Sequence, residues 1–201
     1  MSAQVAPPYP LTFSVDYPDR ELNRVTTGFR LILAIPLLLL LALFAQGHPA
    51  SAGLLLFLPV LALLVLRHKY PRWWFDFNLQ ITRLEARIYS YAFLLRDEYP
   101  SVDQEQAVHV DIVYPDAENE LNRWLPLVKW ILAIPHYIVL AFLYIAVIVV
   151  VIIAWFAILF TGRYPEGMFD FVVGVVRWSL RVTAYAFLLV TDRYPPFSLA
   201  P

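Results

Sequence analysis

Two short stretches of the chain alternate apolar and polar residues, and each predicts a β-strand with one wet face. The first covers residues 11–17 and the second covers residues 108–112. Successive side chains of a strand point to opposite faces, so a period of two marks a half-buried strand. A lone strand leaves backbone groups unpaired. We therefore expect the two strands to pair with each other or with a neighbouring protomer.

Long apolar runs follow each predicted strand. Residues 29–45 and 52–66 form two runs joined by an uncharged, turn-rich link at 46–51. Each run is shorter than the roughly 20 residues that cross a bilayer. In the second half one run covers residues 131–160, and as a single helix it would extend about 45 Å. We predict an apolar helical hairpin at 29–66 and, by analogy between the halves, another at 130–160, with one long helix as the alternative.

A third element in each half carries a polar stripe at helical spacing. The polar positions are four and three residues apart in turn, which places them on one face of a helix. The stripe residues are Asp76, Gln80, Arg83, Arg87 and Ser90 in the first half and Asp170, Gly174, Arg177, Arg181 and Ala184 in the second. The pattern predicts amphipathic helices at 73–95 and 168–190 that lie in the membrane interface.

The stripe arginines are the candidate binding residues. Arg83 and Arg87 are four residues apart, as are Arg177 and Arg181. Two adjacent guanidinium groups suit the phosphate of a lipid headgroup, an anionic lipid in particular. General contact with headgroups is the simpler interpretation, and ion pairing between repeats or subunits is a third.

The two halves also match in sequence. The blocks LNR, ILAIP, FDF and YAFLL occur in the same order in both halves, and each YAFLL is followed by an Asp and then Tyr-Pro. Matched blocks in register are typical of an internal repeat. We predict a polar tail at 1–10, a first repeat at 11–102 and a second at 107–197. The fold class is a mainly α integral membrane protein.

Tyr-Pro pairs mark the ends of the predicted elements. Proline disfavours helix in the preceding residue, and a tyrosine ring suits the headgroup layer. We predict that six aromatic residues anchor the protein at the membrane surface: Tyr70, Tyr99, Tyr164, Tyr194, Trp73 and Trp74.

The composition is typical of a protein in a lipid environment, and the sequence has no catalytic or metal-binding motif. The chain is 60% hydrophobic and 15% charged, with a net charge of -1 and no cysteine. Soluble domains are about half apolar and a quarter charged. The four histidines lack metal-ligand spacing, and no phosphate-binding glycine loop is present. We therefore expect no catalytic residues, no enzyme activity, no metal, no cofactor and no nucleic-acid partner.

The matched blocks resemble the bacterial membrane-protein family catalogued as domain of unknown function 4389. The resemblance covers the chain past residue 10 and implies a bacterial inner-membrane protein with a duplicated domain. It implies no activity, cofactor or site residues.

The expected function is non-enzymatic. Lysines and arginines flank both apolar regions but not the 46–51 link, which predicts a multi-pass protein with cytoplasmic termini. We expect a scaffold or accessory subunit that binds membrane lipids and assembles as a homo-oligomer or within a larger membrane complex. The alternative is a lipid-handling or small-solute transport protein that uses the stripe arginines.

Overall fold

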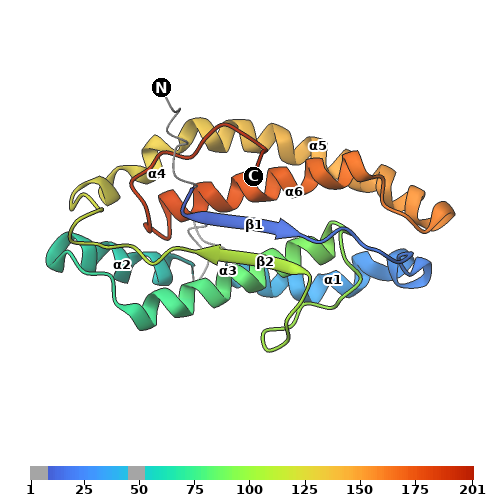
Figure 1. The fold of residues 1–201 in the computed structure, drawn as a ribbon, viewed down its shortest axis with the longest axis horizontal. Helices are drawn as coiled ribbons and strands as arrows, with labels where there is room; N and C mark the ends of the chain where they lie inside the picture. The colour runs from blue at the N-terminus through green and yellow to red at the C-terminus, as the bar shows by residue number, and fades with distance from the viewer. Residues whose placement is uncertain (1–8, 45–52) are drawn as a thin grey trace, which may run out of the picture.

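The computed structural model describes residues 9–44 and 53–201, which form a mainly helical fold with one small sheet (Figure 1). Residues 1–8 of the predicted tail and the predicted 46–51 link lie outside the described residues. The elements in chain order are β1 (Leu11–Val15), α1 (Arg24–Phe44), α2 (Gly53–Arg67), α3 (Arg72–Ala92), β2 (Val108–Ile112), a 3-10 turn η1 (Leu125–Leu127), α4 (Lys129–Leu132), α5 (Ile134–Thr161) and α6 (Glu166–Ala186).

Both predicted strands are present, and they pair with each other. β1 and β2 run antiparallel, with Phe13 opposite Val110 at the centre of the register. One face of the pair is buried, and its residues are Leu11, Phe13, Val15, Val108, Val110 and Ile112. The intervening residues are exposed, as the alternating pattern predicts.

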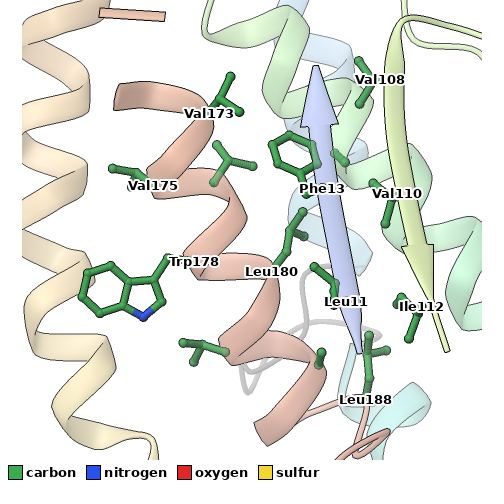
Figure 2. Packing of buried hydrophobic residues seen from close by; sticks show 14 of the residues in the cluster. Leu11, Phe13, Val108, Val110, Ile112, Val173, Val175, Trp178, Leu180 and Leu188 are labelled. Carbon is green, nitrogen blue, oxygen red and sulfur yellow. The ribbon is translucent and has the colours of Figure 1, made fainter. Parts of the chain in front are cut away.

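The sheet and most of the helices enclose the main core, and a second, smaller apolar cluster lies between α1 and α3. β2 packs on α3 and β1 on α6, while α1 packs on α3, α5 packs on α6, and α1 meets α5. The sheet therefore closes one side of the core, and α1 with α5 closes the opposite side. In Figure 2, Trp178 points from α6 toward α5, whereas Leu180 of the same helix points toward β1.

The two amphipathic helices begin and end close to their predicted bounds. α3 and α6 each start directly after a Tyr-Pro pair, with the proline in an extended conformation. They end at Ala92 and Ala186, inside the YAFLL blocks rather than beyond them. Leu94 and Leu189 then adopt positive φ angles of 65° and 57°, and burial of both side chains stabilises this unfavourable conformation.

The predicted hairpin at 130–160 is wrong. Residues 134–161 form the single helix α5, which the short α4 precedes. Pro135 lies in the first turn of α5, where a proline needs no N–H partner and starts a helix instead of breaking it. Between Pro135 and Gly162 the run contains no glycine or proline. The helix ends at Gly162, whose φ of 76° suits a C-terminal cap.

The predicted hairpin at 29–66 is also wrong, because its two ends lie at opposite ends of the molecule. The N–H of Leu22, just before α1, donates to the carbonyl of Gly162 at the end of α5 (2.8 Å). Val65, near the end of α2, accepts a hydrogen bond from Arg123, which precedes α4 and α5 (2.6 Å). α5 is about 42 Å long at about 1.5 Å per residue. α1 and α2 therefore extend along the molecule instead of folding back together.

Candidate functional site

The stripe arginines of α3 bind other segments of the same chain. Arg83 donates from Nε to the carbonyl of Val110 (3.0 Å) and pairs with the carboxylate of Asp111 (2.8 Å). Arg87 donates to the carbonyl of Ser101, in the segment between α3 and β2. Both side chains thus attach β2 and the chain leading to it to the face of α3.

The stripe arginines of α6 make corresponding contacts with β1 and the C-terminal segment. Arg177 donates from Nε to the carbonyl of Phe13 (2.9 Å) and from Nη1 to that of Leu199 (2.8 Å). Arg181 is buried and donates to the carbonyl of Ala200 (3.0 Å). Phe13 and Val110 are the central partners of the sheet. In a two-stranded sheet the backbone groups on the two outer edges have no strand partner. On each edge an arginine side chain donates a hydrogen bond to the central carbonyl instead.

The predicted aromatic anchors divide into two groups. Tyr70 and Tyr164 are buried in the core, so the prediction that these two rings lie at the membrane surface is wrong. Each stacks edge-on against the phenylalanine five residues later, which buries the ring. Tyr99, Tyr194 and Trp73 are exposed, and Trp74 is half-buried. Their role as anchors stays a prediction.

A buried ion pair lies at the start of α1, and sequence reasoning missed it. The side chain of Arg30 is 1% exposed and pairs with Asp97, which follows the first YAFLL block. Its guanidinium also donates to the carbonyl of Arg96 (3.0 Å) and lies 4.9 Å from the ring centre of Tyr91. Asp97 accepts the backbone N–H of Asn23 as well (2.7 Å).

A second buried pair has the same construction in the other half. Lys129 is fully buried and pairs with Asp192, which follows the second YAFLL block (2.7 Å). Its ammonium donates to the carbonyl of Thr191 (2.7 Å) and lies 5.3 Å from the ring centre of Tyr185. Asp192 accepts the backbone N–H of Asn122. The same contact therefore occurs twice: a cation before ILAIP pairs with the aspartate after YAFLL, which also accepts the N–H of the asparagine in LNR. In the sequence, the matched positions of Arg30 and Lys129 indicated this contact.

Glu85 is the second group that sequence reasoning missed. It lies on α3 with 7% of its surface exposed, and its Oε1 has no hydrogen-bond partner among the described residues. Burial raises the pKa of this carboxyl from its usual 4.5 to about 8. Asn78 and Thr82 are buried on the same helix at helical spacing. This second polar line on α3 was visible in the sequence beside the arginine stripe.

The other histidines and acidic residues that the structure describes are dispersed over the fold. Among residues 9–44 and 53–201, no group of three His, Asp or Glu side chains is placed to hold a metal ion. His136 accepts a hydrogen bond from Nε1 of Trp178 (3.0 Å) and stacks on Phe197 at 4.0 Å between ring centres. This histidine joins α5, α6 and the C-terminal segment.

Comparison with known proteins identifies one family. Residues 124–198 match the family model described as Domain of unknown function (DUF4389), which confirms the resemblance for this part of the chain. No curated protein and no solved structure matches the chain.

Proposed function

Residues 124–198 carry a domain of unknown function, and from the structure around them we propose that this protein is a membrane-embedded, non-enzymatic scaffold built from two tandem repeats. It assembles with further copies of itself or with other membrane proteins. The observation that carries the proposal is the exposed apolar surface of α5.

α5 is long and apolar enough to cross a membrane, and it is hardly covered by the protein. Its most apolar 18-residue window has a mean hydropathy of 3.2, and only 17% of that window is buried. A core helix of a soluble protein would be mostly buried. The exposed residues along one side are Ile138, Phe142, Ile145, Val149, Ile152, Phe156 and Phe160. Lipid or an apolar partner is the environment in which this surface is stable.

α1 and α2 extend the apolar surface. The side chains that α1 exposes include Phe29, Ile32, Leu33, Ile35, Leu38 and Leu39, and those of α2 include Leu58 and Leu66. After Arg30, α1 contains no charged residue, and α2 contains none before its last residue, Arg67. The exposed surfaces of α1, α2 and α5 that the structure describes are therefore apolar over most of their length.

Corresponding contacts support the tandem repeats. Tyr17 donates to the carbonyl of Tyr164, and Tyr114 donates to the carbonyl of Tyr70 (2.5 Å). Each strand thus packs on the amphipathic helix of the other repeat. The Tyr-Pro pair after β1 contacts the Tyr-Pro pair before α6, and the pair after β2 contacts the pair before α3. The two buried ion pairs also lie at matching positions in the two repeats, as do the two contacts between an arginine and a strand carbonyl. Duplication of one unit accounts for all three sets.

The arginine contacts favour a scaffold over a lipid-handling protein. All four candidate headgroup ligands donate to carbonyls of this chain. A guanidinium already bound to carbonyls has fewer donors left for a lipid phosphate.

Native mass spectrometry of the protein, released gently from its own membrane, tests the proposal. We expect a discrete assembly with stoichiometric protein subunits and loosely held lipid. A monomer that retains one defined lipid through collisional activation would instead support lipid handling. Recovery of the protein in the soluble fraction, without detergent, would overturn membrane embedding itself.

A further inference from the structure

The orientation of the apolar surface relative to the sheet decides how the protein meets a bilayer. We propose that the molecule lies flat in one leaflet, with α1, α2 and α5 in the acyl layer and the sheet facing water, and that no helix crosses the membrane. This inference rests on the proposed membrane embedding and differs from the multi-pass arrangement that the sequence predicts.

The sheet lies beside the middle of α5. Phe13 of β1 is bound by Arg177, in the middle of α6. Two residues later on α6, Ser179 hydrogen-bonds to Tyr144, which lies near the middle of α5. Figure 1 shows β1 and β2 running along the long axis of the molecule, roughly parallel to α5 and α6, at mid-length. The sheet centre is therefore close to the level of the centre of α5.

A membrane-crossing α5 would place exposed charges of the sheet in the hydrocarbon. The carboxylates of Asp16 and Asp111 are 63% and 78% exposed on the outer face of the strands or at their ends, and the polar side chain of His109 is 54% exposed beside Asp16. The hydrocarbon core extends roughly 15 Å to either side of the bilayer centre, so these groups would lie within it. Charged side chains at that depth are expensive and need a protein or water-filled surrounding.

A flat orientation places both the apolar helices and the charged strands in a suitable environment. The apolar helices lie opposite the sheet, so one leaflet covers them while water covers the strands. Amphipathic elements in such an orientation bury their apolar face about 5–10 Å into the boundary between headgroups and acyl chains. The middle layer, α3 and α6, then lies parallel to the membrane plane.

The charges at the two ends of α5 agree with this orientation. Arg20, Arg24 and Arg163 are exposed at the end where α5 finishes, and Arg67, Lys69 and Arg123 at the end where it starts. A crossing helix has lysine and arginine concentrated on one side of the membrane. Exposed lysines and arginines lie at both ends, beside exposed carboxylates such as Glu21, Glu118 and Glu166, so they show no such one-sided concentration.

Depth measurements by spin labelling test the orientation. Because the chain has no cysteine, single substitutions Ile138→Cys, Val149→Cys and Phe160→Cys place labels along one side of α5. The protein is reconstituted in vesicles of phosphatidylcholine and phosphatidylglycerol, and label accessibility to oxygen is compared with accessibility to a water-soluble nickel chelate. Ser14→Cys, on the outer face of β1, is the matched control.

A flat molecule gives nearly equal depths at the three α5 positions and a water-exposed label at Ser14→Cys. A deep label at position 149 with shallow labels at 138 and 160 would show a crossing helix and overturn the orientation while leaving membrane embedding intact. Labels on α5 that are as accessible to the nickel chelate as the label on Ser14→Cys would instead overturn membrane embedding.

Impermeant maleimide labelling in native membrane vesicles gives a second test that needs no reconstitution. Glu118→Cys lies near the end of the molecule where α5 starts, and Glu166→Cys lies near the end where it finishes. Both positions are exposed. We expect both cysteines to react from the same side of the membrane. Reaction from opposite sides would overturn the flat orientation.

Discussion

At the scale of single residues, two buried cations are each bound by several specific partners. Arg30 and Lys129 each combine an ion pair, a carbonyl and an aromatic ring. A buried pair is costly to desolvate, and removing one partner costs more than the pair itself contributes. Glu85 differs because no cation among the described residues compensates its burial.

Loss of Lys129 alone should destabilise the protein strongly. Lys129→Met leaves the carboxylate of Asp192 without its cation, and we expect the free energy of unfolding to fall by roughly 3–5 kcal/mol. Thermal unfolding in detergent measures the change. Adding Asp192→Asn should restore part of the loss, because an amide oxygen still accepts the N–H of Asn122. Arg24→Ala, which breaks an exposed pair with Glu21, is the control. An equal effect of both single variants would contradict the prediction.

Glu85 should make the protein less stable as pH rises. Its folded-state pKa of about 8 lies above its usual 4.5, so between these values the folded state holds a proton that the unfolded state releases. Stability therefore falls as pH rises through this window and levels off above it. Glu85→Gln removes the effect, and the variant should gain stability over the native protein by on the order of a few kcal/mol near pH 8.5.

Thermal unfolding from pH 5 to 9 measures how stability depends on pH in the native protein and in Glu85→Gln. Glu118→Gln, at an exposed position, should leave the slope unchanged. Parallel curves for Glu85→Gln and the native protein would show that the carboxyl is ionised in the folded state.

At the scale of elements, α6 is a helix packed on three sides. It contacts α5, β1 and the C-terminal segment, and its stripe position Gly174 lies directly beneath Leu199. A Cβ at position 174 would be 2.8 Å from the Cβ of Leu199 and 3.0 Å from its carbonyl oxygen. The close approach of the C-terminal segment therefore requires glycine here.

Gly174→Ala should displace the C-terminal segment from α6. Overpacking of this kind costs about 1–3 kcal/mol, and the helix propensity of alanine offsets about 1 kcal/mol of it. We expect faster carboxypeptidase digestion and a lower unfolding temperature. Gly167→Ala on the same helix meets no atom within 4 Å and should be neutral or stabilising. Equal digestion of the two variants would contradict the proposed contact.

At the scale of the whole molecule, the strands hold the two halves together. Each strand packs on the amphipathic helix of the other half, and the strands pair with each other. The connection between the halves passes through residues 103–105, which are exposed.

A chain divided after Gln104 should therefore reassemble. We expect co-expressed fragments 1–104 and 105–201 to copurify from the membrane with equal stoichiometry, because β1 remains on α6 and β2 on α3. Affinity purification through a tag on one fragment measures this. Phe13→Asp, which places a charge in the buried sheet centre, should abolish copurification. Fragments that purify separately would show that the two halves do not depend on the strand exchange.

Periodicity by itself determined four elements of this protein, β1, β2, α3 and α6, whereas tertiary structure decided how all the elements are arranged and which groups their polar residues bind. The alternating stretches and the helical stripes identified β1, β2, α3 and α6 because local spacing sets which face a side chain occupies. The periodicity of an apolar run carries no such signal, because a hairpin and a continuous helix are equally apolar. The absence of glycine and proline between Pro135 and Gly162 permits one helix, and in the folded chain α5 packs on α6 in that form. The arginine stripe, likewise, was visible in the sequence. Arg83 and Arg177, however, donate to strand carbonyls 27 and 164 residues away in the chain, and only the folded chain brings these groups within hydrogen-bonding distance.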